Sequence, residues 1–102
     1  MNMKAILAKR EAMRNEWGEN VAVQCEWRGD ITMEEVMKHR TPEDCWNVIN
    51  GVVYDMTQYV CKHPGGASPL VQRADISSVF KTFHKHIKID FLHKLKIGNL
   101  VQ

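Results

Sequence analysis

The pair Asn50-Gly51 constrains the fold of this chain more than any other short motif. It separates two runs of strand-forming residues, 45–49 and 52–54. Asn-Gly between such runs is the strongest short-range signal for a two-residue β-hairpin, because both turn residues need a positive φ angle. The sequence therefore predicts an antiparallel hairpin over residues 45–54.

The 102 residues of the chain are enough for one domain with a small core. A domain of this size is marginally stable unless a ligand or a crosslink adds stability. The longest uninterrupted apolar run, Ala5 to Ala8, is far shorter than the roughly 20 residues of a membrane-spanning helix. We therefore predict no transmembrane anchor and no secretory signal.

Cysteine usage bears on the compartment in which the protein works. Cys25, Cys45 and Cys61 are an odd number of cysteines without CxxC spacing. Such cysteines are typical of reduced thiols in a reducing compartment. We therefore predict a cytoplasmic protein, small enough to enter the nucleus, and we expect it to be a monomer.

The N-terminal residues 4–16 are strong helix formers without glycine or proline, so they predict a helix that stops near Gly18. Its narrow apolar stripe indicates packing on the main domain or on a partner; the stripe consists of Ile6, Met13 and Trp17. The alternating residues 21–27 predict a strand with one buried face. A turn at Arg28-Gly29-Asp30 is expected to follow.

Further helices are predicted on both sides of the hairpin. Thr32 and Glu35 form a capping box, which starts a helix. A short helix is expected between the hairpin and His63. Apolar residues recur at helical spacing over residues 76–95, which predicts one continuous helix ended by Gly98.

His63 precedes Pro64-Gly65-Gly66, a rigid residue followed by two residues without a Cβ. The proline fixes the backbone beside the imidazole, and the glycines leave room for a bulky planar group. This pattern is typical of a ligand histidine. A histidine before Pro-Gly-Gly is also compatible with a plain helix-ending turn.

His84 favours the ligand interpretation. It lies 21 residues after His63, and Phe80 precedes it by four residues on the same helix face. Two histidines among aromatic residues suit an apolar slot that holds a planar metal macrocycle between two axial imidazoles. His86 competes for the second position, but it lies roughly 200° around the predicted helix and points away from the apolar face. We therefore predict His84.

Several segments together resemble the cytochrome b5 family of heme-binding domains. His63-Pro64-Gly65-Gly66 is the most specific of them, Trp46 stands 17 residues before His63, and residues 51–57 read Gly-Val-Val-Tyr-Asp-Met-Thr. The resemblance extends from Met33 through Leu100. It implies an α+β, cytochrome b5-like heme-binding fold, in which a small mixed sheet and helices form a heme pocket. Residues 1–20 then form an N-terminal helical extension, and residues 21–102 form the domain.

The resemblance also implies the site residues. His63 is one axial ligand of heme b, and His84 is the other, since it lies 14 residues before Gly98 as the family requires. The other predicted cofactor-binding residues are Ile49, Met56, Tyr59, Pro64, Gly65, Leu70, Phe80, Phe83, Lys85, Phe91 and Leu95. Lys85 is expected to pair with a heme propionate.

The function implied is that of an electron carrier between a reductase and an acceptor, not of an enzyme. Two axial imidazoles leave the iron without an open position for oxygen or peroxide. Residues 1–60 carry a net charge of −3 and residues 61–102 a net charge of +5. This basic half is either a solvated face or a surface for acidic partners. Because four lysines lie near the ligands, we predict redox partners with acidic docking surfaces; the lysines are Lys62, Lys81, Lys85 and Lys88.

Two other functions fit the sequence less well. A zinc-stabilised interaction module would use Cys61, His63, His84 and His86, but ligands two residues apart on a helix point to different sides. Nucleic-acid binding would require arginines interleaved with exposed aromatic residues, and the basic half has no such cluster. We therefore predict no nucleic-acid partner.

Overall fold

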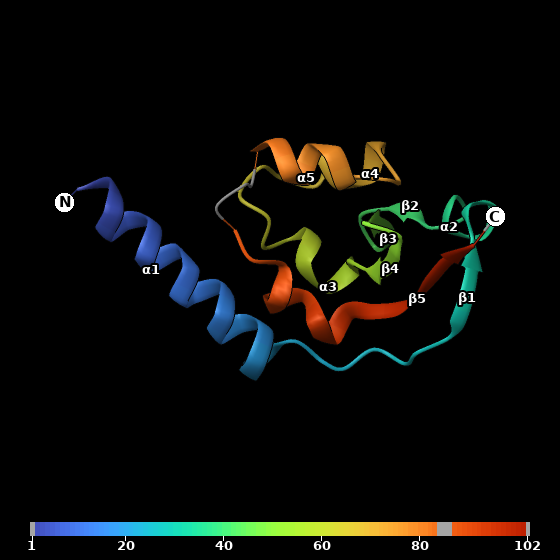
Figure 1. Ribbon diagram of the computed structural model, residues 1–102, viewed down its shortest axis with the longest axis horizontal. Coiled ribbons are helices and arrows are strands. Elements are labelled where there is room, and N and C mark those ends of the chain that lie inside the picture. The colour runs from blue at the N-terminus through green and yellow to red at the C-terminus, as the bar shows by residue number, and fades with distance from the viewer. Residues whose placement is uncertain (1, 84–86, 102) are drawn as a thin grey trace.

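The structure is a computed structural model that describes residues 2–83 and 87–101, apart from the side chain of Phe83. Figure 1 shows its helices and strands. In chain order they are α1 (Met3–Glu16), η1 (Trp17–Val21), β1 (Gly29–Thr32), α2 (Met33–Val36), β2 (Arg40–Thr41), β3 (Asp44–Ile49), β4 (Val52–Asp55), α3 (Thr57–Val60), α4 (Ser68–Gln72), α5 (Ser77–Phe83), η2 (Ile89–Leu95) and β5 (Lys96–Val101).

The strands of the described residues form one five-stranded sheet in the order β1-β5-β4-β3-β2. β5 pairs in parallel with β1 and antiparallel with β4, so the sheet is mixed. β3 and β4 form the predicted hairpin, and its turn has a positive φ of 51° at Asn50 and 79° at Gly51. The predicted α+β class with a small mixed sheet is therefore confirmed.

Strand β3 is buried on both faces and contributes to two apolar clusters. Trp46 and Val48 pack with Val36 of α2 on one face of the sheet. Cys45 and Ile49 pack on the other face, where α3, α4 and η2 lie. Successive side chains of a strand point to opposite faces, so one short strand serves both clusters. The second of these faces carries the cavity described below.

The helix start predicted at Thr32 is present. The Oγ1 atom of Thr32 accepts a hydrogen bond of 3.2 Å from the backbone N–H of Glu35, as an N-cap does. Ile31 and Val36, which flank this turn, are both buried in the same apolar cluster. α2 is thereby fixed against the sheet by its first turn.

The prediction of a strand over residues 21–27 is wrong. Residues 23–28 have no regular secondary structure, and Val23 and Trp27 are 69% and 53% exposed instead of forming a buried face. The backbone N–H of Cys25 donates to the carbonyl of Lys94, which belongs to the helical segment η2. The alternating pattern indicated an extended backbone, but a β-strand also needs a neighbouring extended strand with which to form its hydrogen bonds. The expected turn at residues 28–30 is absent as well, because β1 begins at Gly29.

The prediction of one helix over residues 76–95 is also wrong. α5 ends at Phe83, residues 87–88 are not helical, and a 3-10 segment, η2, begins only at Ile89. Figure 1 shows α5 and η2 as separate elements that do not share an axis. Gly98 lies within strand β5 and does not end a helix. Apolar residues at helical spacing are compatible with two helical segments of different orientation as well as with one long helix. Each of the two segments buries the apolar residues that it carries.

The N-terminal helix α1 begins at the predicted place, where the side chain of Asn2 accepts a hydrogen bond from Ala5. Figure 1 shows its first half projecting from the rest of the molecule. Gly18 is not a helix stop: it is buried in η1, and a Cβ there would collide with the carbonyl group of Phe91. No helix within the described residues is long and apolar enough to cross a membrane.

Candidate functional site

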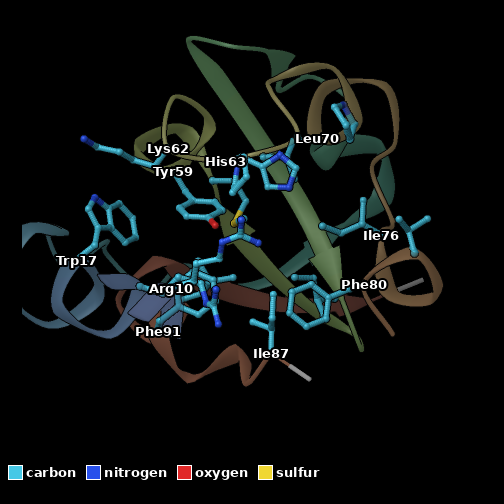
Figure 2. Close-up of a pocket in the computed structure, with 18 of the residues that line it drawn as sticks. Arg10, Trp17, Tyr59, Lys62, His63, Leu70, Ile76, Phe80, Ile87 and Phe91 are labelled. Atoms are coloured by element: carbon cyan, nitrogen blue, oxygen red, sulfur yellow. The ribbon is translucent and has the colours of Figure 1, made fainter. Parts of the chain in front are cut away.

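A cavity of about 740 Å³ opens between α1, the α3–α4 segment, α5 and η2. Figure 2 shows the side chains that line it. Its volume lies within the roughly 300–1,000 Å³ of small-molecule sites. Most of the wall is apolar or aromatic; this part of it is formed by Met13, Trp17, Ile49, Met56, Tyr59, Pro64, Pro69, Leu70, Ile76, Val79, Phe80, Ile87, Phe91 and Leu92.

His63 is the wall residue that can bind a metal, and the loop after α3 holds it in place. Its backbone N–H donates to the carbonyl of Tyr59, and its ring Nδ1 lies 2.8 Å from the carbonyl oxygen of Gly66. A carbonyl oxygen only accepts, so Nδ1 is the donor in this contact, and in the neutral form of such a ring Nε2 carries the lone pair. A hydrogen bond of this kind orients metal-binding histidines.

The two glycines after Pro64 have different roles. Gly66 has a φ of 83°, which turns the chain so that its carbonyl faces the imidazole. Gly65 lies against the ring itself, since a Cβ there would come within 2.8 Å of Cε1 of His63. The glycines therefore leave the expected room beside the His63 ring, and the backbone of Gly65 occupies part of that room.

A second support of the site is the carboxyl end of α4, which carries Leu70 into the cavity wall. The Nη2 atom of Arg40 donates to the carbonyls of Leu70 and Val71, at 2.6 and 2.7 Å. The fully buried amide of Asn47 donates to Leu70 and to Arg73, at 2.9 and 2.7 Å. These bonds satisfy carbonyls that the end of a helix leaves without partners. The sequence analysis missed both residues; the one signal was an asparagine inside an apolar strand.

Tyr59 joins the aromatic side chains on the α1 side of the cavity. Its ring centroid lies 5.4 Å from that of Phe91, 5.9 Å from that of His63 and 5.3 Å from that of Trp17. Burial raises the pKa of the Tyr59 phenol, and the positive charge of Arg14 offsets part of this rise. The phenol is therefore neutral at physiological pH, and the positive charge of Arg14 in α1 influences this part of the cavity wall.

The structure brings most of the predicted site residues to this one cavity. Besides His63, the predicted residues that line it are Ile49, Met56, Tyr59, Pro64, Gly65, Leu70, Phe80 and Phe91. Leu95 does not line the cavity; it is fully buried in the apolar core, in the same cluster as Phe91. His84 and Lys85 lie outside the described residues, as does the side chain of Phe83.

The sequence analysis missed the contribution of the N-terminal segment to this wall. Arg10, Met13 and Arg14 of α1 and Trp17 of η1 line the cavity. The apolar stripe of α1 indicated a packing surface, but no local pattern named its partner. Only contacts between residues far apart in the chain assign it to the cavity.

Two other histidines have partners elsewhere. His39 stacks on Trp46 with ring centroids 3.6 Å apart, and its Nδ1 lies 2.8 Å from the carboxylate of Asp44. His93 is exposed, and its Nε2 lies 2.8 Å from the carboxylate of Glu19. Within residues 2–83 and 87–101, no three side chains of the metal-binding types are grouped as a metal site. His84 and His86, two of the four ligands of the zinc alternative, lie outside those ranges.

A family model described as "Cytochrome b5-like Heme/Steroid binding domain" matches residues 32–101. The chain belongs to this family. Its match covers the sheet from the end of β1, the His63 loop, α5 and β5. The predicted cytochrome b5-like fold is therefore confirmed. Heme is the cofactor of cytochrome b5 domains, and such a domain is an electron-carrier module that is not itself catalytic.

Curated relatives share this domain within much longer proteins. L-lactate dehydrogenase (cytochrome) of Saccharomyces cerevisiae is 44% identical over 59% of this chain and 10% of its own length. An acyl-lipid (8-3)-desaturase of Physcomitrium patens is 42% identical over 69% of this chain and 15% of its own length. NADH nitrate reductase of Volvox carteri is 44% identical over 69% of this chain and 8% of its own length. The chain therefore spans only a small part of these proteins.

Solved structures of similar size show the same fold. Cytochrome b5 of Ostreococcus tauri virus 2 is 28% identical, with a TM-score of 0.54 over 72% of this chain and 98% of its own. Cytochrome b558 of Ectothiorhodospira vacuolata, a prokaryotic homologue of cytochrome b5, is 32% identical, with a TM-score of 0.59 over 70% of this chain and 96% of its own.

The cavity of this cytochrome b5 domain fits heme. Its wall is apolar enough for a macrocycle and includes an imidazole, held by its Nδ1 contact with Gly66, of the kind that binds heme iron through the other ring nitrogen. Gly65 lies beside that imidazole, where a larger residue would crowd the ring. The residues present are therefore those that a heme site requires on the His63 side.

Proposed function

We propose that this protein binds one heme b and passes single electrons between a reductase and an acceptor protein. The observation that carries the proposal is the position of His63 in the wall of an apolar cavity, with its Nδ1 bonded to the Gly66 carbonyl. When bound, heme iron supplies a one-electron couple between the ferric and ferrous states. The family description also names steroids, but a steroid does not need an oriented imidazole.

In this proposal His63 is one axial ligand and His84 is the second. Residues 87–88 are not helical, which removes the argument that His84 shares a helix face with residues further along the chain. What supports His84 is the family spacing: it follows Phe80-Lys81-Thr82-Phe83 directly and precedes Gly98 by 14 residues. His86 is the rival. With both axial positions filled by histidines, the protein is a carrier and catalyses no reaction at the iron.

The remaining residues of the site exclude water and fix the ligand. The aromatic wall keeps the neighbourhood of the imidazole apolar, which is one of the ways in which a protein tunes a redox centre. Arg40 and Asn47 hold the α4 backbone that carries Leu70. We propose that residues 21–102 form the domain with residues 1–20 as its extension, and that the protein works as a monomer in the cytoplasm.

We also propose that redox partners dock through acidic surfaces. Lys62, Lys81 and Lys88 are exposed on the elements around the cavity. The relatives named above are redox enzymes by name, which supports a function in electron transfer. Opposite charges on two proteins steer their encounter and raise the rate of association.

An absorption spectrum of the purified protein tests the function. Heme with two axial histidines should give a red protein with a strong Soret band and sharp visible bands after reduction. A colourless protein that gains no Soret band when heme is added would overturn the proposal. Stoichiometric zinc in such a protein would favour the interaction module.

A further inference from the structure

The N-terminal helix places positive charge at an apolar cavity. Arg10 and Arg14 of α1 line the cavity, and Lys62 lines it from the α3 side. Figure 2 shows Arg10 within the ring of side chains that includes Tyr59, Ile87 and Phe91. Among the described residues that form this wall there is no aspartate or glutamate. A ligand of this cavity therefore meets an apolar surface and several cations.

Within residues 2–83 and 87–101, neither arginine forms an ion pair with another side chain. Among the described residues, the ion pairs of the structure involve lysine and histidine but neither Arg10 nor Arg14. The guanidinium of Arg14 lies 5.9 Å from the ring centroid of Phe91, which orients it at the wall. Grouped cations in a largely apolar site repel each other unless an anion binds between them.

The carboxyl end of α1 is held against the domain by contacts that do not involve these arginines. Trp17 packs on Tyr59, and Glu19 pairs with His93 through a contact of 2.8 Å. The amide of Gln58 exchanges two hydrogen bonds with the backbone of Val23, at 2.8 and 2.9 Å. Gly18 permits close approach to Phe91. Side chains other than these arginines therefore dock the helix, and Arg10 and Arg14, which line the cavity, can bind a ligand there.

We propose that Arg10 and Arg14 bind the propionate carboxylates of heme, so that α1 is part of the heme site. This proposal rests on the proposed function. Heme b carries two carboxylates on one edge of an apolar macrocycle, and both are ionised at neutral pH. The planar guanidinium forms bidentate hydrogen bonds with a carboxylate, which a lysine ammonium does not. The extension thus lowers the rate at which heme leaves the pocket.

The rate of heme release tests this inference without any measurement of electron transfer. The double variant Arg10→Gln/Arg14→Gln is loaded with heme and mixed with excess apomyoglobin, which captures the heme that leaves. We expect the double variant to release heme on the order of tenfold faster than the wild type, because it loses two partly exposed ion pairs with the propionates. Its Soret and visible bands should not change, because neither arginine is an axial ligand.

The matched control is Lys4→Gln/Lys9→Gln on the same helix. Both lysines are exposed, neither lines the cavity, and the change in net charge is the same. This control should release heme at the wild-type rate. Equal rates for the arginine variant and the wild type would overturn the inference. Equal acceleration in both double variants would also overturn it, because general charge would then explain the effect.

Heme dimethyl ester, whose propionates are neutral, separates carboxylate binding from packing. With this ester, the wild type and the arginine variant should release at the same rate. If the arginine substitutions accelerate release of both hemes equally, the arginines act by packing α1 on the domain, and the inference is wrong. Failure of the proposed function itself is distinguishable, because the wild type would then give no Soret band.

Discussion

The Nδ1 atom of His63 lies 2.8 Å from the carbonyl oxygen of Gly66, three residues further along the chain. One short loop therefore turns the backbone and also sets the tautomer of the proposed ligand. The loop can do both because Gly66 adopts a positive φ while Gly65 passes beside the imidazole ring. Heme affinity should accordingly depend on backbone glycines as well as on the histidine.

Gly65→Ala should weaken heme binding without unfolding the protein. The added Cβ would lie 2.8 Å from Cε1 of His63, so the ring must move and its bond to Gly66 must lengthen. Gly65 does not have a positive φ, so alanine itself is compatible with the backbone there. Loss of about 1 kcal/mol from one hydrogen bond corresponds to roughly fivefold faster heme release. An unchanged release rate would show that the ring has room to adjust.

The axial ligands can be assigned by three single variants. His63→Ala and His84→Ala should each convert a low-spin heme spectrum to high-spin or abolish heme binding, because each removes one axial imidazole. His86→Ala should leave the spectrum unchanged. If His86→Ala gives the high-spin form and His84→Ala does not, His86 is the second ligand. His93→Ala is the control, because His93 is exposed and pairs with Glu19.

Asn47→Ala should destabilise the fold by roughly 1–3 kcal/mol, because it removes the amide that donates to the Arg73 carbonyl and one of the donors to the Leu70 carbonyl, which Arg40 also binds. Asn47 is fully buried, and its amide donates to Leu70 and Arg73. Urea unfolding of the apoprotein measures the change in the free energy of unfolding. Asn99→Ala is a matched control, since Asn99 is exposed. Equal midpoints for the two variants would contradict the role assigned to Asn47.

Removal of heme should lower the melting temperature. A ligand that binds only the native state stabilises it by about 3 kcal/mol when its free concentration is roughly a hundred times Kd. The proposed heme cavity of about 740 Å³ is bounded by aromatic side chains, so the near-UV circular dichroism should also be weaker when heme is removed. Calorimetry of the apo and holo forms checks this expectation, and identical melting temperatures would refute it.

Electron transfer with an acidic partner should slow as salt is added. Lys62, Lys81 and Lys88 are exposed, and the Debye length falls to about 8 Å at 0.15 M ionic strength. Stopped-flow measurement of the reduction rate at increasing salt concentrations and constant pH tests this expectation. A rate that rises with salt would instead indicate a basic partner surface.

Local signals in the sequence determined the hairpin, the cap of α2 and the His63 loop. Asn50-Gly51, Thr32 with Glu35, and Pro64-Gly65-Gly66 each act over two to four residues, through allowed φ angles or one hydrogen bond. Such preferences do not depend on what the rest of the chain does. The loop that carries His63 could therefore be predicted from its immediate neighbours.

The tertiary structure decided the path of residues 23–28, the separation of α5 from η2 and the position of α1. In each case the sequence pattern was compatible with more than one partner, and burial against distant residues selected one. Trp17 packs on Tyr59, and Gly18 lies against the backbone of Phe91. The backbone N–H of Cys25 donates a hydrogen bond to the carbonyl of Lys94. The spacing of apolar residues indicates which residues are buried, but not which other part of the protein buries them. For that reason Arg10 and Arg14 could be recognised as cavity residues only in the folded molecule.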